Sequence, residues 1–221
     1  MKPLIRSSSL LATAALLAAC ASTTQFDYSH DGLELRDVRG LDEVWVRPGT
    51  DFASYEKLFI EPVEVAFDPH WDPRRTGSRL PLRDKDREQI RTDTAELFDT
   101  TFKTELARSD RFELVDQTGP NTLIFKPQII DLIINAPEDP TAVGISRTYV
   151  SEFGRVTLIG ELKDAETGAI LARIADREIA RAISPLEFAD RFANEREGER
   201  VVRKWADALI EPLSGLGDAS R

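Results

Sequence analysis

The sequence predicts an α+β domain, in which a mainly antiparallel sheet packs against an amphipathic helix and a C-terminal helical segment. Three observations carry this prediction. Residues 84–108 repeat apolar side chains at spacings of three and four, which is typical of one face of an α-helix. Residues 122–134 are an apolar stretch with the pattern of a central strand. Residues 150–164 and 169–182 flank a turn that ends in Gly168, as in a β-hairpin.

The N-terminus has the parts of a secretory signal. Lys2 and Arg6 precede an apolar run that is shorter than the ~20 residues a membrane-spanning helix needs. The run ends in Leu17-Ala18-Ala19-Cys20, and Cys20 is the single cysteine of the chain. This ending resembles the signal of bacterial lipoproteins, whose cysteine is acylated and becomes the first residue. We therefore predict a signal peptide at 1–19 and lipidation of Cys20; the alternative is an ordinary signal with an incidental cysteine.

A lipidated cysteine would tether the protein to a membrane, because two or more acyl chains give stable anchoring. We predict a lipidated N-terminus and tether at 20–41, one α+β periplasmic domain at 42–214 and a frayed tail at 215–221. Ala21 stands where an Asp would resemble an inner-membrane retention signal. The predicted location is therefore the cell envelope, at the outer membrane and facing the periplasm.

Charge and cysteine content exclude several kinds of partner. The net charge is −10, and it becomes about −12 when residues 1–19, with Lys2 and Arg6, are removed. An acidic protein is a poor match for the phosphate backbone, so no nucleic-acid partner is expected. Once Cys20 is acylated, no thiol remains for a disulfide or a cysteine-ligated zinc ion.

The remaining strands follow from apolar alternation and from prolines. A short strand is expected at 42–47, and another at 57–66 with Pro62 at an edge or bulge. Residues 67–82 contain three prolines and predict a loop, and residues 111–116 predict a short strand. Residues 122–134 are apolar on both faces, so we expect this strand to be covered twice, with a bulge at Pro127.

The C-terminal part is predicted to be helical. Ser184-Pro185 resembles a helix start, and Gly198 is a candidate break within the helix. We expect this helix to cover the other face of the sheet or one of its edges. Two apolar stripes are expected to make its contacts: Phe188 and Phe192, then Val201, Val202, Trp205, Leu209 and Leu213.

No recognisable catalytic set is present. The chain has two histidines, His30 and His70, and lacks both a nucleophile elbow and a phosphate-binding glycine loop. Asp68, His70 and Asp72 are the best candidates for binding a metal ion, but the surrounding prolines favour a surface turn. We therefore predict no enzymatic activity, no catalytic residues, no metal site and no cofactor.

Residues 45–65 resemble the opening of a family of proteobacterial lipoproteins that is known only as a domain of unknown function. The resemblance covers residues 42–182 and implies a similar signal followed by a strand, a helix and paired strands, without naming an activity. The shared features are Pro48-Gly49, Asp51, Tyr55, Lys57 and Pro62-Val63.

Two functions fit these observations. The first is a non-enzymatic binding or scaffolding module of the cell envelope, which the predicted anchor and the absent catalytic set favour, with an envelope protein as its possible partner. The alternative is an auxiliary lipoprotein of an envelope transport system that binds a small or lipidic ligand. A large apolar pocket between helix and sheet would favour the alternative, and a filled core would oppose it.

Overall fold

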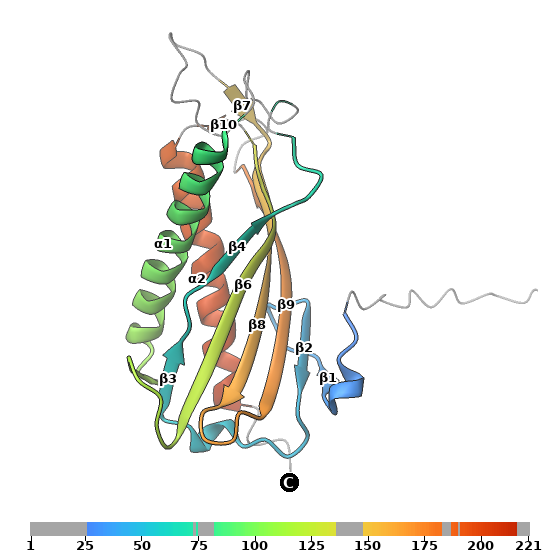
Figure 1. Ribbon diagram of the computed structural model, residues 1–221, viewed down its shortest axis with the longest axis vertical. Helices are drawn as coiled ribbons and strands as arrows, with labels where there is room; N and C mark the ends of the chain where they lie inside the picture. Colours follow the sequence, from blue (N-terminus) through green and yellow to red (C-terminus); the bar gives the residue numbers. More distant parts are fainter. Residues whose placement is uncertain are drawn as a thin grey trace, which may run out of the picture.

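The computed structural model describes residues 26–72, 74, 82–135, 148–182, 187–189 and 191–215. Cys20, the predicted signal at 1–19, the predicted helix start Ser184-Pro185 and half of the predicted loop at 67–82 (residues 73 and 75–81) lie outside these residues. Figure 1 shows the described part as one long twisted sheet with two long helices beside it.

The helices and strands have the following bounds. The helices are α1 (Asp84–Arg108) and α2 (Arg191–Gly215), with short 3-10 turns η1 (Ser29–Asp31) and η2 (Phe52–Ser54). The strands are β1 (Glu34–Arg36), β2 (Glu43–Val46), β3 (Lys57–Ile60), β4 (Glu64–Phe67), β5 (Glu113–Leu114), β6 (Thr122–Ile134), β7 (Thr148–Val150), β8 (Glu152–Asp164), β9 (Ile170–Arg181) and β10 (Glu187–Ala189).

Within the described residues, the main sheet has eight strands in the order β1-β2-β9-β8-β6-β3-β5, with β4 also beside β6. The neighbours β1/β2, β2/β9, β9/β8 and β8/β6 are antiparallel. By contrast, β3 and β4 run parallel to β6, and β5 runs parallel to β3. Strands β7 and β10 form a separate pair. The predicted α+β class is confirmed, and so is the hairpin of β8 and β9, where Gly168 has a φ of 71°.

Both prolines of the sheet lie at one interruption in the pairing. Pro62 splits the strand predicted at 57–66 into β3 and β4. The bulge predicted at Pro127 is wrong, because Pro127 pairs in register with Gly160. The carbonyl of Phe125 accepts from the Glu61 N–H at 2.9 Å, so residues 125 and 127 direct their backbone polar groups toward β3 and β4. Pro127, which has no N–H, thus lies opposite the gap between these strands.

The bulge of β6 lies at Asp131 instead. The register shifts there against both β4 and β8, and Asp131 has a φ of 53°. A bulge bends its strand and increases the local twist, so the last residues of β6 continue in a new direction.

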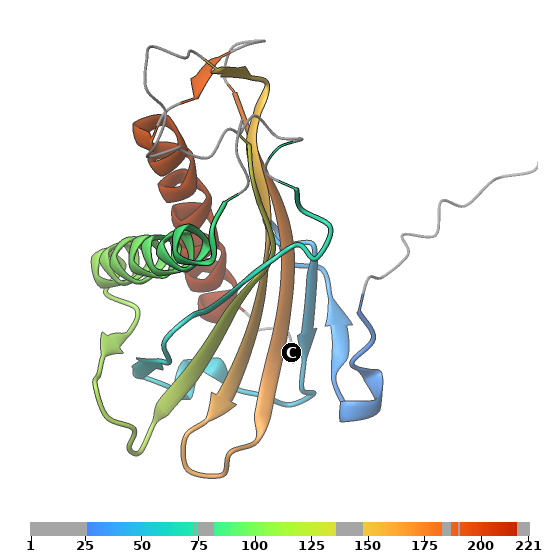
Figure 2. The same ribbon diagram turned by 45° about the horizontal axis from the view of Figure 1, so that its top comes forward.

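The two helices lie on the same face of the sheet, as Figure 2 shows. The prediction that the C-terminal helix covers the other face or an edge is therefore wrong: α2 packs beside α1. Gly198 does not break α2, which is continuous through it. A Cβ atom at Gly198 would lie 3.4 Å from Leu97 Cδ2, so the glycine allows the two helices to approach closely.

The apolar stripes of α2 were predicted in part. Val201, Val202, Trp205 and Leu209 are buried, as expected. The other predicted pair is wrong, because Phe188 belongs to strand β10 and the Phe192 side chain is 72% exposed. Neither α1 nor α2 combines the length and the apolar character that a helix needs to cross a bilayer.

Aromatic side chains fill the core where the second half of α1 meets the sheet. The rings of Phe98 and Phe102 stack with their centroids 4.8 Å apart, and Phe102 stacks on Phe125 of β6 at 5.4 Å. Gly160 of β8 leaves room for the Phe125 ring, because a Cβ there would lie 2.7 Å from Phe125 Cε2. Leu106 completes this contact and is fully buried.

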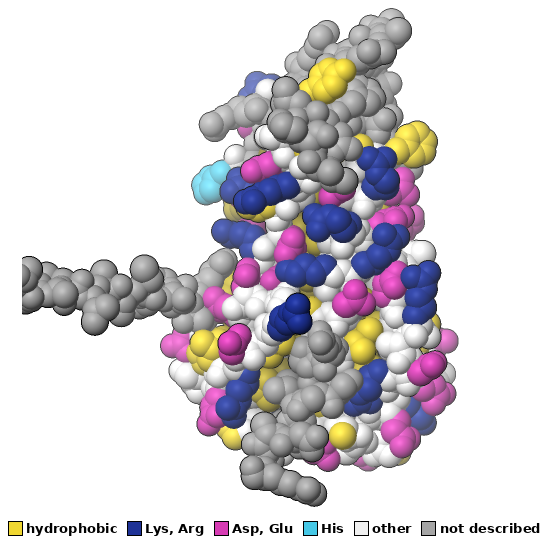
Figure 3. All heavy atoms as spheres, turned by 180° about the vertical axis from the view of Figure 1, so that it is seen from behind, with side chains coloured by type: hydrophobic (Ala, Val, Ile, Leu, Met, Phe, Trp, Pro, Cys, Tyr) yellow, Lys and Arg dark blue, Asp and Glu magenta, His cyan; other side chains and the backbone are white. Residues whose placement is uncertain are grey.

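The sheet face opposite α1 and α2 is not covered by an α-helix in the described part of the chain. On this face β6 presents Ile124, Lys126, Gln128 and Ile130, all half-buried. The expectation that β6 is covered twice is thus wrong, although β6 is central in the sheet. On the other side of the molecule, which carries α2, Lys and Arg side chains alternate with Asp and Glu rather than gathering into a patch of one sign (Figure 3).

Candidate functional site

A cleft of about 690 Å³ opens between α1, α2 and the part of the sheet formed by the ends of β6, β8 and β9. Figure 2 shows that α2 and the long strands diverge toward the end of the molecule that carries β7 and β10. We call this space the helix–sheet cleft. A second, much smaller hollow of about 10 Å³ lies between Val38, Phe52 and Leu209.

The cleft exists because the apolar stripe of α1 serves two purposes. Its second half, with Phe98, Phe102 and Leu106, fills the core. Its first half, with Ile90, Thr94 and Leu97, is only half-buried and lines the cleft. Threonine is too short to bridge the space that a leucine or phenylalanine would fill, so the first half of the stripe leaves a hollow.

The floor of the cleft is apolar. The sheet and α2 contribute most of it, and Trp205, with 2% of its surface exposed, lies at its base. The apolar lining consists of Leu82, Ile90, Leu97, Ile129, Leu132, Ile133, Ile134, Phe153, Val156, Ala180, Val201, Val202 and Trp205.

Carboxylates dominate the polar lining. Among the described lining residues, Arg155 is the sole basic one, and the acidic ones are Asp86, Asp93, Glu96, Glu195 and Glu199. Two of these acidic groups have basic partners outside the cleft. Arg83 donates to Asp86 at 2.8 Å and thereby lowers the pKa of that carboxyl, and Arg203 pairs with Glu199 at 2.5 Å.

Asn194 adds an unpaired acceptor to the lining. Its Oδ1 atom is buried and has no hydrogen-bond partner. Buried polar atoms are normally hydrogen-bonded, and an unpaired one carries a desolvation cost. A ligand whose N–H or O–H reaches this oxygen, once the Asn194 side chain turns toward the cleft, would remove that cost.

A buried polar cluster behind the cleft holds α2 on the sheet. Asp176 of β9 is 1% exposed and accepts from Trp205 Nε1 at 2.8 Å, from Lys204 Nζ at 3.2 Å and from the Asp42 N–H at 2.9 Å. Burial raises the pKa of Asp176, although the donors from Trp205 and Lys204 oppose the shift. The Trp205 side chain is therefore fixed by its indole N–H while its ring forms part of the cleft.

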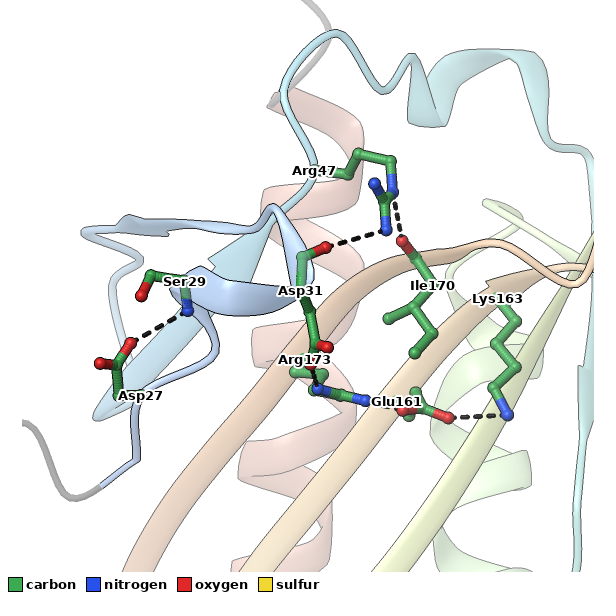
Figure 4. A network of polar contacts seen from close by, with 8 residues as sticks. All are labelled: Asp27, Ser29, Asp31, Arg47, Glu161, Lys163, Ile170 and Arg173. Carbon is green, nitrogen blue, oxygen red and sulfur yellow. Dashed lines mark hydrogen bonds and ion pairs between the residues drawn. The ribbon is translucent and has the colours of Figure 1, made fainter.

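On the opposite face of the sheet, residues 26–36 are held by Arg173 of β9, as Figure 4 shows. Arg173 forms ion pairs with Asp31 and with Glu161, and Glu161 also pairs with Lys163 at 2.7 Å. Burial raises the pKa of Glu161, but the bonds from Lys163 and Arg173 outweigh it and lower the pKa below its ordinary value. Strand β1 then pairs with β2 and extends the sheet.

The candidate residues from the sequence lie apart from the cleft. Cys20 is outside the described residues, so its predicted lipidation stays a prediction. Asp68 accepts from the His70 N–H at 2.7 Å and Asp72 pairs with Arg74 at 3.1 Å, as in a surface turn. Within the described ranges, no three His, Cys, Asp or Glu side chains are grouped to hold a metal ion.

The helix–sheet cleft does not follow from the local sequence pattern. One signal in the sequence could have indicated it: Thr94 and Thr101 interrupt the apolar stripe of α1, where a filled core would favour larger side chains. The unpaired Asn194 and the position of α2 beside α1 depend on tertiary packing, for which the local pattern carries no signal.

The chain belongs to the family described as "Protein of unknown function (DUF3313)", whose model matches residues 24–209. The resemblance to a family defined only by a domain of unknown function is confirmed to that extent. No curated protein matches the chain.

Two solved structures are similar in overall arrangement at low sequence identity. The PelC dodecamer from Paraburkholderia phytofirmans is 10% identical, with 76% of this chain and 96% of that chain covered and a TM-score of 0.40. A protein of the DUF330 family from Xanthomonas campestris is 12% identical, with 80% and 94% covered and a TM-score of 0.42.

Proposed function

We propose that the chain is a lipid-anchored binding protein of the cell envelope, which performs no catalysis and holds a small or lipidic apolar ligand in the helix–sheet cleft. The observation that carries this proposal is the cleft of about 690 Å³ with its apolar floor. Sites for small molecules in proteins are typically ~300–1,000 Å³, largely apolar and fitted with a few polar groups. Such a protein would serve as an auxiliary lipoprotein of an envelope transport system.

Binding in the cleft can be measured with Trp205 as the reporter. Trp45→Phe and Trp71→Phe leave Trp205 as the single tryptophan, and bromoundecanol quenches a tryptophan only when its bromine lies close to the indole. The acylated full chain is placed in phosphatidylcholine nanodiscs. Saturable quenching is expected, whereas quenching that rises linearly without saturation would contradict the proposed site.

A matched pair of variants shows where the probe binds. Thr94→Phe places a ring in the cleft, and the added volume displaces the alkyl chain of the probe. The affinity read from the quenching curve should therefore fall at least about tenfold. Thr92→Phe makes the same change on the exposed face of α1 and should leave binding unchanged. Equal binding by both variants would rule out the cleft.

The proposed membrane attachment runs through lipid on Cys20, and Ala21 supports a location at the outer membrane facing the periplasm. Cells are labelled with an alkyne analogue of palmitate. The label should be lost in Cys20→Ser and kept in the neighbouring control Ser22→Ala. Ala21→Asp should move the protein from the outer-membrane to the inner-membrane fraction. Labelling of Cys20→Ser would overturn the anchor.

An envelope protein is the second candidate partner, because the sheet face opposite the helices has no helix over it in the described ranges. Ile124, Ile130 and Ile159 lie half-buried on that face. A photo-crosslinking residue at Lys126, tested in intact cells, should capture a defined protein, whereas the same residue at Glu88 on the outer side of α1 should not. Failure at Lys126 would exclude this face.

A further inference from the structure

We infer that the helix–sheet cleft selects its ligand by the head group, and that it takes an amphiphile with a hydrogen-bond-donating, cationic or neutral head in preference to an anionic one. This inference rests on the proposed function and names the chemical class of the ligand. Two independent features of the cleft carry it: the charge of its polar lining and the buried oxygen of Asn194.

The polar lining has an excess of negative charge. Asp86 and Glu199 are neutralised in part by Arg83 and Arg203. Glu96 and Glu195 make no ion pair with any described residue, and Arg155 is the one basic side chain among the described lining residues. An anionic head at the mouth of the cleft would meet like charge and be repelled, whereas a cationic head would be attracted.

The unpaired oxygen of Asn194 favours a donor for a separate reason. When the Asn194 side chain turns toward the cleft, a neutral alcohol or an ammonium head can donate to its Oδ1 atom, whereas a carboxylate has only acceptors. A ligand with an anionic head would leave this buried acceptor unsatisfied, and it would add a second acceptor beside it. Charge and hydrogen bonding therefore favour the same order: ammonium, then alcohol, then carboxylate.

The Trp205 reporter compares three probes that share one alkyl chain: bromoundecylamine, bromoundecanol and bromoundecanoate. In phosphatidylcholine nanodiscs, corrected with empty nanodiscs, the amine should bind at least about tenfold tighter than the carboxylate, with the alcohol between them. Added salt should reduce the difference in affinity between the amine and the carboxylate, because it screens the exposed carboxylates of Glu96 and Glu195 at the mouth of the cleft, which we call the rim.

Three variants separate the effect of the rim charge on head-group preference from the effect of Asn194. Glu96→Gln with Glu195→Gln should weaken the amine about threefold or more and leave the alcohol unchanged, because only the charge of the rim is altered. Glu88→Gln with Glu113→Gln removes the same charge at exposed positions outside the cleft and should change neither. Asn194→Leu should weaken the amine and the alcohol but not the carboxylate, and should raise the melting temperature of the unliganded protein, since an unpaired acceptor is removed.

The outcomes distinguish the two proposals. If no probe quenches Trp205 in a saturable way, the proposed binding function fails. If all three bind with equal affinity, or if the carboxylate binds tightest, the function stands and the head-group selection is overturned. If the amine is preferred but the rim and Asn194 variants leave that preference intact, the assignment to these residues is overturned.

Discussion

The guanidinium carbon of Arg173 lies 4.6 Å from the centre of the Tyr28 ring, so a residue of β9 covers an aromatic side chain of the N-terminal segment. The same guanidinium pairs with Asp31 and, through Nε at 2.9 Å, with Glu161. Tyr28 meets Trp45 edge to face, with ring centres 6.1 Å apart. These contacts hold residues 26–36 on the sheet, next to the segment predicted to lead to the membrane.

Arg173→Met should release this segment, because it removes two charged hydrogen bonds and the contact with Tyr28 while it keeps most of the side-chain volume. We expect a loss of about 2 kcal/mol in the free energy of unfolding. Amides of residues 28–36 should exchange with solvent faster than in the wild type. The control is Arg36→Met, whose ion pair with Glu34 is exposed and should cost less than ~0.5 kcal/mol. Unchanged exchange in Arg173→Met would show that the segment is held by other contacts.

Gly154 is required where β8 passes the bulged end of β6. A Cβ atom there would lie 2.2 Å from the carbonyl oxygen of Ile133, and backbone cannot move aside as a side chain can. Gly154→Ala should therefore lower the free energy of unfolding by about 3 kcal/mol in urea denaturation. Gly119→Ala is the matched control, because no atom lies within 4 Å of its added Cβ. Equal stability of the two variants would mean that β6 relaxes away from the clash.

The sequence predicted what depends on local pattern. The bounds of α1 and the turn at Gly168 follow from spacing and from residue type. The side of the sheet that α2 covers did not follow, because the buried stripe around Trp205 fits either face equally well. The closeness of α1 and α2 depends on Gly198 meeting Leu97, which is a contact between residues about 100 positions apart.

Asp176 tests how firmly α2 is held against the sheet. Asp176→Ala would leave the Trp205 N–H, the Asp42 N–H and the Lys204 ammonium without this acceptor, although Lys204 keeps its pair with Glu178. We expect a loss of about 3–5 kcal/mol in the free energy of unfolding, which urea denaturation measures. Asp207→Ala on the exposed side of α2 should cost less than ~0.5 kcal/mol. A loss below about 1 kcal/mol in Asp176→Ala would show that water replaces the carboxylate.

Tyr55 makes stability depend on alkaline pH. Its hydroxyl donates to Asp164 Oδ2 at 3.0 Å, and burial together with this bond raises the pKa of Tyr55 from 10.0 to about 12. The folded protein keeps the phenol proton where the unfolded chain has lost it, so this contribution is complete below pH 10 and is lost as the pH rises through about 12. Tyr55→Phe removes the hydroxyl and with it this pH-dependent contribution to stability.

The stability difference between wild type and Tyr55→Phe, measured in urea, should be constant near neutral pH and shrink above pH 10. Tyr149→Phe, at a side chain that is 53% exposed, controls for the loss of a phenol. A difference that persists unchanged into the alkaline range would show that Tyr55 ionises equally in both states.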